Sequence, residues 1–113
     1  MQYLALIYAD ESASAEKKAP MEAWFAFGQK HGSVILGGNA LQPVATAKTL
    51  REEGGGMLST DGPFAETREA LGGYYLLECR DHAHALEVAK DIPIYGVGCV
   101  EVRPIMEIPS APE

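Results

Sequence analysis

Four ionisable side chains are concentrated in the nonapeptide 61–69, which reads DGPFAETRE. Its first three residues, Asp-Gly-Pro, predict a reversal of the chain, because Gly adopts conformations that a Cβ forbids and Pro fixes φ. The apolar run 71–77 follows and is typical of a central strand. Ionisable groups at a turn beside a buried strand are where a ligand or catalytic site is expected.

Asp61 is the residue of this segment that is best suited to acid–base chemistry. Desolvation beside apolar strands can raise the pKa of a carboxylate toward neutral pH, which would make Asp61 a general base. His31 is predicted in the last turn of a helix, and a neutral imidazole near Asp61 would complete a catalytic dyad. Both residues also have simpler interpretations. Asp61 would only form the turn, and His31 would compensate the helix dipole or be solvated.

Three further residues are candidate ligand contacts. Arg68 could bind a carboxylate through two parallel hydrogen bonds, with Glu66 orienting a small polar ligand beside it. The hydroxyl of Tyr74 could steady an anionic or hydroxylated substrate. The alternatives are a surface ion-pair cluster of little energetic weight and a Tyr74 side chain that lies in the core or in a dimer interface.

Composition and residue spacing argue against several classes of function. The formal net charge of −7 makes direct binding to nucleic acid unexpected. Cys79 and Cys99 lie in apolar segments without metal or redox spacing, and His82 and His84 point in different directions on a helix. We therefore expect no metal and no other cofactor. The first apolar stretch ends at Asp10 and is too short for a membrane span, so we expect a cytoplasmic protein without membrane association.

The order of the expected elements predicts one domain over residues 1–113 with an α+β fold. Strands are expected at 3–9, 34–36, 74–79 and 100–108, with helices at 20–31 and 82–92. Segments 46–52 and 57–60 flank a Gly-rich turn and predict an extra hairpin. This is the split βαβ pattern of a ferredoxin-like βαββαβ sandwich, with both helices on one face of an antiparallel sheet.

A single layer of two helices would leave the other face of this sheet uncovered. A homodimer that packs sheet against sheet would cover it, with more than about 1,000 Å² of surface buried. The residues expected on the uncovered face are Tyr3, Ala5, Ile7, Tyr75, Leu77 and Cys79.

The nonapeptide DGPFAETRE resembles the motif for which the DGPF-domain proteins of the YCII-related group are named. Segment 71–77, the helix after Asp81 and the sequence VEVRPIM at 100–106 are similar to family segments in the same order, so the resemblance covers nearly the whole chain. Arg68 departs from the family pattern, which usually has Lys there. The resemblance implies a ferredoxin-like α/β barrel formed by two chains, with a cleft near Asp61. Members are often encoded beside extracytoplasmic-function sigma factors, which implies a regulatory setting.

Some YCII-related relatives carry a His on the first helix that is thought to act with an Asp in acid–base chemistry. Alignment through residues 32–38 puts Met21 at that position, and Met cannot transfer protons. Two functions are therefore expected for a small-molecule cleft near Asp61. The first is a cofactor-independent acid–base enzyme, and the second is a non-catalytic ligand-binding or regulatory module that acts with a sigma factor.

Overall fold

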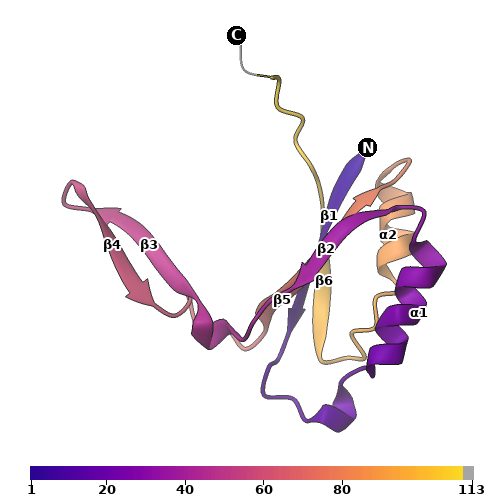
Figure 1. Ribbon diagram of the computed structural model, residues 1–113, viewed down its shortest axis with the longest axis horizontal. Coiled ribbons are helices and arrows are strands. Elements are labelled where there is room, and N and C mark those ends of the chain that lie inside the picture. Colours follow the sequence, from indigo (N-terminus) through magenta and orange to yellow (C-terminus); the bar gives the residue numbers. More distant parts are fainter. Residues whose placement is uncertain (111–113) are drawn as a thin grey trace.

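A computed structural model describes residues 1–110 and shows a four-stranded antiparallel sheet, two helices on one of its faces and a separate two-stranded hairpin (Figure 1). The sheet has the order β2-β5-β1-β6, and its strands are β1 (Gln2–Ala9), β2 (Ile35–Ala40), β5 (Ala70–Glu78) and β6 (Gly98–Pro104). The other elements are α1 (Met21–His31), α2 (His82–Ala89), the hairpin strands β3 (Lys48–Glu53) and β4 (Gly56–Asp61), and the short 3-10 helices η1 (Ala15–Lys17) and η2 (Val44–Thr46).

This topology confirms the predicted α+β class and is compatible with a ferredoxin-like sandwich. All three strand pairings of the sheet are antiparallel, and β5 lies between β2 and β1 although it follows both in the chain. The extra hairpin is inserted between β2 and β5, as predicted. Within residues 1–110, neither helix has the length and apolar character needed to cross a membrane.

The core lies between the sheet and its two helices. Asp81 is the N-cap of helix α2, as the sequence predicts, and its carboxylate accepts a hydrogen bond from the backbone N–H of His84 at 2.8 Å. Its residues Ala85, Val88 and Ala89 recur at helical spacing and are buried. Phe27 of α1 is also buried and packs against Tyr75 of β5 in a tilted arrangement, with ring centroids 5.0 Å apart.

The prediction of which sheet face lies open is wrong. Tyr3, Ala5 and Ile7 are buried beneath the helices together with Leu77 and Cys79, and Tyr75 packs against this cluster. Because side chains alternate across a strand, the opposite face carries the other apolar set. We call that surface the open face; its residues are Leu4, Leu6, Tyr8, Leu71, Tyr74 and Leu76.

Two irregularities shape the edges of the sheet. A register shift between Ile35 and Gly37 confirms the bulge predicted from the double Gly of β2. The last strand is shorter than predicted, because β6 ends at Pro104, which has no N–H to donate to a strand ladder. Met106 and Ile108 lie beyond it and are 80% exposed, so their predicted place in a half-buried strand is wrong.

The hairpin β3–β4 projects away from the rest of the molecule, on the side opposite to the helices (Figure 1). Its tip contains Gly54 and Gly55 with φ of 59° and 83°, which is the conformation that two-residue hairpin turns require. The residues of both strands are exposed apart from the half-buried Thr49.

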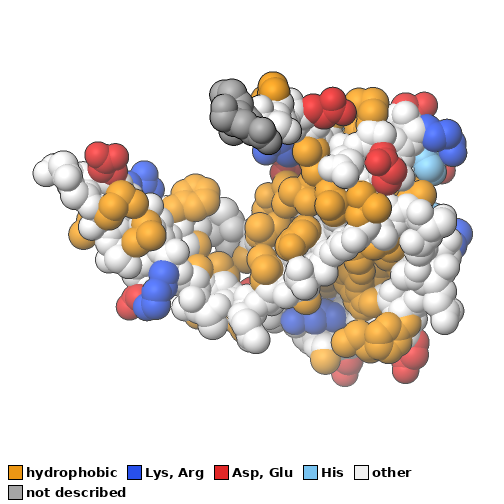
Figure 2. All heavy atoms as spheres, turned by 45° about the horizontal axis from the view of Figure 1, so that its top comes forward, with side chains coloured by type: hydrophobic (Ala, Val, Ile, Leu, Met, Phe, Trp, Pro, Cys, Tyr) orange, Lys and Arg blue, Asp and Glu red, His pale blue; other side chains and the backbone are white. Residues whose placement is uncertain are grey.

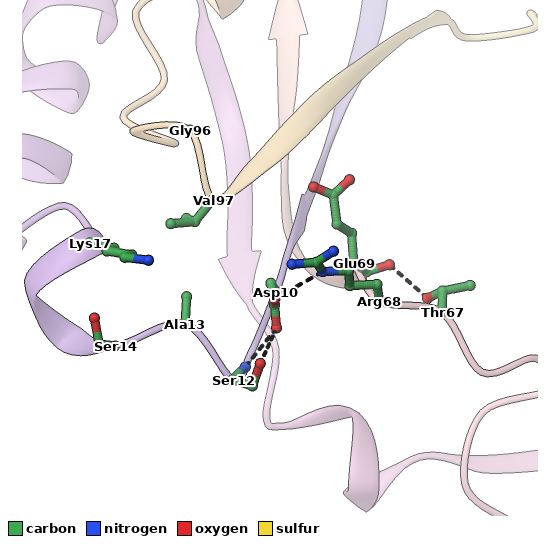
Figure 3. A pocket seen from close by; sticks show the side chains of 10 residues that line it. All are labelled: Asp10, Ser12, Ala13, Ser14, Lys17, Thr67, Arg68, Glu69, Gly96 and Val97. Carbon is green, nitrogen blue, oxygen red and sulfur yellow. Dashed lines mark hydrogen bonds and ion pairs between the residues drawn. The ribbon is translucent and has the colours of Figure 1, made fainter.

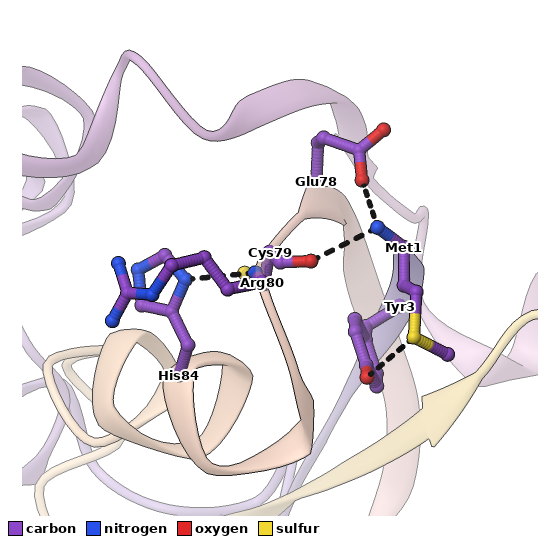
Figure 4. Close-up of polar contacts among 6 residues, drawn as sticks. All are labelled: Met1, Tyr3, Glu78, Cys79, Arg80 and His84. Atoms are coloured by element: carbon purple, nitrogen blue, oxygen red, sulfur yellow. Dashed lines mark hydrogen bonds and ion pairs between the residues drawn. The ribbon is translucent and has the colours of Figure 1, made fainter.

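A polar cluster joins Met1, directly before β1, to the end of β5 (Figure 4). The backbone nitrogen of Met1 donates to the carbonyl oxygen of Cys79 at 3.0 Å and lies beside the Glu78 carboxylate. The imidazole of His84 accepts a hydrogen bond from the backbone N–H of Arg80 at 3.1 Å. These contacts hold strand ends and the start of α2 together, so we assign the cluster a structural role.

Candidate functional site

A cleft of about 830 Å³ lies at one end of the sheet (Figure 3). Three loops form it: the segment after β1, the segment before β5 and the segment before β6. Its lining residues are Asp10, Ser12, Ala13, Ser14, Lys17, Thr67, Arg68, Glu69, Gly96 and Val97.

The antiparallel register explains why these distant segments meet. Ala9, the last residue of β1, pairs with Ala70 at the start of β5 and with Gly98 at the start of β6. The backbone N–H of Asp10 then donates to the carbonyl oxygen of Val97 at 2.9 Å, which fixes the first and third loops to each other. The central strand therefore ends between the two strands that begin beside it, and the loops at those ends form one site.

Asp10 is the organised carboxylate of this cleft. Its Oδ1 accepts hydrogen bonds from the hydroxyl and the backbone N–H of Ser12, at 2.6 and 2.9 Å, and Oδ2 lies 3.5 Å from Nε of Arg68. The Ser12 hydroxyl and then the Ser12 N–H lower the pKa of Asp10, with a smaller contribution from Arg68. Asp10 is thus ionised at neutral pH and is a weak base.

Two cationic side chains point into the cleft from opposite sides, Lys17 from η1 and Arg68 from the loop before β5 (Figure 3). The Arg68 side chain is 90% exposed and uses Nε toward Asp10, so its two terminal nitrogens have no hydrogen-bond partner within residues 1–110. A guanidinium offers donors in a planar fork that matches a carboxylate. The arrangement can therefore hold a small organic anion.

A second, more apolar hollow of about 240 Å³ adjoins the cleft. The two share Asp10 and Val97 as common lining residues. The charged cleft thus has beside it a hollow that suits a ring or a short aliphatic group. Its lining residues are Ile7, Ala9, Asp10, Glu11, Lys18, Ala19, Trp24, Pro93, Ile94 and Val97.

Asp61 lies outside this cleft, at the end of β4. The predicted turn is present, because Gly62 has a φ of 91° and its N–H donates to the carbonyl oxygen of Ala47 at 2.7 Å. The Asp61 carboxylate accepts from the ammonium group of Lys48 at 2.7 Å instead of from the backbone, and it is 87% exposed. Lys48 is also its partner in the strand register.

Asp61→Asn is expected to have little effect on stability or on ligand binding in the cleft. Exposed ion pairs contribute between zero and about 1 kcal/mol, and Asn keeps the size of the side chain. Urea unfolding of both proteins should therefore give free energies of unfolding that agree within about 1 kcal/mol. Loss of binding in a folded Asp61→Asn protein would instead favour the predicted role of Asp61 as a functional carboxylate.

His31 also has a partner of its own. Its Nε2 lies 2.7 Å from the carboxylate of Asp91, which Lys30 approaches at 2.9 Å, and its ring packs on Phe27. Hydrogen bonds from His31 and then from Lys30 lower the pKa of Asp91. The pair links the end of α1 to the turn after α2. The structure thus bonds Asp61 and His31 to different residues and does not join them in a dyad.

Of the predicted ligand contacts, Arg68 lines the cleft and the other two do not. Tyr74 lies on the open face, where its hydroxyl accepts a hydrogen bond from the side-chain amide of Asn39 at 3.0 Å. Glu66 is exposed in the loop between β4 and β5. Sequence reasoning missed Asp10 and Lys17. The available signal was Asp10-Glu11-Ser12 directly after a central strand, a pattern typical of a side-chain-stabilised turn.

Comparison with known proteins places this chain in a family. The model of the YCII-related domain matches residues 1–109. The chain belongs to the YCII-related family. A relative of this chain, the uncharacterized protein R00369 of Rhizobium meliloti (strain 1021), is 37% identical over a 124-residue alignment. That alignment covers 97% of this chain and 100% of the relative, so the similarity extends over the cleft, the hairpin and both helices.

Proposed function

We propose that this YCII-related protein binds a small organic anion that carries an apolar group, and that it does so without a cofactor. The observation that carries this proposal is the convergence of Lys17 and Arg68 on a cleft that shares Asp10 and Val97 with an apolar hollow lined by Trp24. A carboxylate of the ligand would bind Arg68, and a ring or short chain would occupy the hollow.

The two parts of such a site would supply different contributions to affinity. A hydrogen bond to a charged group contributes about 1.5–3 kcal/mol, and it gives orientation. Apolar burial contributes about 25 cal/mol per Å² removed from water. A ligand with both groups therefore binds more tightly than acetate, which has only the first, or than an alcohol of the same shape, which has only the second.

The electrostatics favour binding over catalysis. Asp10, one of the two carboxylates that line the cleft, has a lowered pKa and accepts protons poorly at neutral pH. The Cys99 thiol lies 3.6 Å from the Glu69 carboxylate. Desolvation and then this carboxylate raise the pKa of the thiol. A thiol that stays protonated is a weak nucleophile.

The second candidate, a cofactor-independent acid–base enzyme, needs a base that touches the ligand. Asp10 lines the cleft and has the position for this role, whereas Asp61, the base that the sequence predicts, lies outside the cleft and is paired with Lys48. Turnover of a bound ligand, followed by NMR and lost in Asp10→Asn, would favour the enzyme. A regulatory module would instead report the bound state to a partner, and the family resemblance suggests an extracytoplasmic-function sigma factor for that role, because members are often encoded beside one.

We also propose that the protein is a homodimer joined through the open face. This surface is apolar over β1 and β5, and hydrophobic side chains gather on the body of the molecule beside the hairpin (Figure 2). Contiguous apolar surface of this kind marks an interaction site. We keep the predicted sheet-to-sheet dimer and place Leu4, Leu6 and Leu76 in its interface. These residues replace the predicted Tyr3, Tyr75 and Leu77, which lie on the helix-covered face.

Trp24, the single Trp of the chain, lines the apolar hollow and provides the test. Titration with phenylacetate is expected to change the fluorescence of Trp24 with saturation. Acetate and 2-phenylethanol, which each lack one of the two groups, should bind at least about tenfold more weakly. Equal responses to all three compounds, or none to phenylacetate at millimolar concentration, would contradict the proposed function.

A further inference from the structure

The hairpin β3–β4 has little contact with the rest of its own chain. Its two strands contact chiefly each other, and their residues are exposed apart from the half-buried Thr49. An isolated two-stranded hairpin is marginally stable in water, because it has no third layer on which to bury side chains. A projecting hairpin that keeps its shape in solution therefore needs a surface on which to pack.

One side of the hairpin carries the side chains that would form such a contact. Leu50 pairs with Ser59, and Met57 pairs with Glu52, so Leu50 and Met57 are diagonal neighbours on the same side. They are 65% and 66% exposed. Phe64, in the loop directly after the hairpin, is also largely exposed.

The chain as a whole exposes more surface than a compact monomer of its mass. A monomer of 12.1 kDa is expected to expose about 6,000 Å², whereas this chain exposes 8283 Å². Its radius of gyration is 16.6 Å, against about 13 Å for a compact domain of this length. The excess of about 2,000 Å² per chain falls within the range that each partner of an obligate dimer buries.

We propose that the β3–β4 hairpin is an arm that packs on a second copy of this chain, beside or across the open face of that copy. The arm assignment depends on the homodimer proposed above and adds a second contact region to it. Each chain carries both a projecting apolar arm and an uncovered apolar face, so two identical chains satisfy both surfaces around one two-fold axis.

Dimensions agree with this arrangement. A strand of six residues is about 20 Å long, whereas the outer strand axes of a four-stranded sheet are about 14 Å apart. The arm is thus long enough to cross the sheet of a partner. The arm projects on the side opposite to the helices (Figures 1 and 2). The sheet of a second chain can therefore pack on the open face and contact the arm at the same time.

The first test measures the dimer in solution by analytical ultracentrifugation and light scattering. The unsubstituted chain should have twice the monomer mass of 12.1 kDa at micromolar concentration. In the double variant Leu50→Glu and Met57→Glu, the dissociation constant of the dimer should rise about 100-fold or more, because two apolar contacts are replaced by charges. Its circular dichroism should stay that of a folded protein, since the arm contributes little to its own core.

A matched control uses two residues of equal exposure on a helix. Met21 and Phe25 of α1 are 64% and 65% exposed, and the double variant Met21→Glu and Phe25→Glu should dimerise as the parent does. Unchanged dimerisation of the Leu50/Met57 variant would overturn the arm while leaving the homodimer in place. A parent chain that is monomeric would overturn both proposals, and the Trp24 titration would still decide ligand binding.

Hydrogen exchange gives a readout that does not depend on any substitution. In the dimer, the amides of β3 and β4 should be protected to a similar degree as those of β1, and dilution into the monomeric range should remove this protection. Rapid exchange of the whole hairpin in a sample shown to be dimeric would overturn the arm.

Discussion

Replacing Arg68 by Gln is expected to weaken the binding of phenylacetate by about 10- to 100-fold. The guanidinium is the group in the cleft whose planar fork fits a carboxylate, and a hydrogen bond to a charged group contributes about 1.5–3 kcal/mol. Gln keeps most of the apolar stem and one donor but loses the charge. Stability should change little, because the Arg68 side chain is exposed and its contact with Asp10 is long, at 3.5 Å.

Two further variants make this result specific. Arg68→Lys keeps the charge but not the fork, so phenylacetate should bind with an affinity between those of the parent and Arg68→Gln. Arg80→Gln removes an exposed Arg at the junction of β5 and α2, outside the cleft, and should bind as the parent does. Trp24 fluorescence measures all three. Equal affinities for the parent and Arg68→Gln would remove Arg68 from the site and with it the proposed anion contact.

Local signals in the sequence were sufficient to predict most elements of the fold. Asp81 as the N-cap of α2, the Gly54-Gly55 tip of the hairpin and the Gly-rich bulge of β2 all depend on residues close together in the chain. Such signals act through the backbone of their own segment. The structures that these signals specify therefore do not depend on contacts with distant parts of the chain.

The open face could not be predicted in the same way, because β1 is apolar at nearly every position. The sequence YLALIY offers apolar residues in both phases of the strand, so alternation does not say which set meets the helices. The buried phase is Tyr3, Ala5 and Ile7, and the choice depends on packing against α1 and α2. A one-residue change of phase exchanges the two faces, which is the error that the structure corrects.

Only part of the candidate site was predicted, because some of its residues are distant in the sequence and meet only through the fold. Arg68 belongs to the nonapeptide, and its concentration of charge pointed to the correct loop. Asp10 is 58 residues away in sequence and meets Arg68 through the antiparallel register of β1 and β5. Asp61 and His31 each have a nearer partner, Lys48 in the strand register and Asp91 across the helix ends. Their pairing with each other would have required a long-range contact that no local pattern specifies.

Replacing Gly98 by Ala is expected to have the largest effect on stability of any substitution considered. An added Cβ would lie 1.8 Å from the carbonyl oxygen of Tyr8 and 2.8 Å from the Cα of Ala9. Both atoms belong to the backbone of β1, so no side-chain rotation can relieve the clash and the start of β6 must move. We expect a loss of about 2–3 kcal/mol or more, which lowers Tm by roughly 10 °C in a domain of this size.

The control is Gly37→Ala in β2, where no atom lies within 4 Å of an added Cβ, and its Tm should stay close to that of the parent. Gly98 also follows Val97, whose carbonyl oxygen accepts a hydrogen bond from the backbone N–H of Asp10 at 2.9 Å. This bond fixes the loop before β6 to the loop after β1 at the edge of the cleft. Any movement of β6 away from β1 therefore lengthens this bond. At a temperature where Gly98→Ala is still folded, its affinity for phenylacetate should also fall, whereas Gly37→Ala should bind as the parent does. A Gly98→Ala protein with parental Tm would mean that β6 approaches β1 less closely in solution, and the cleft at their ends would lose its rigid wall.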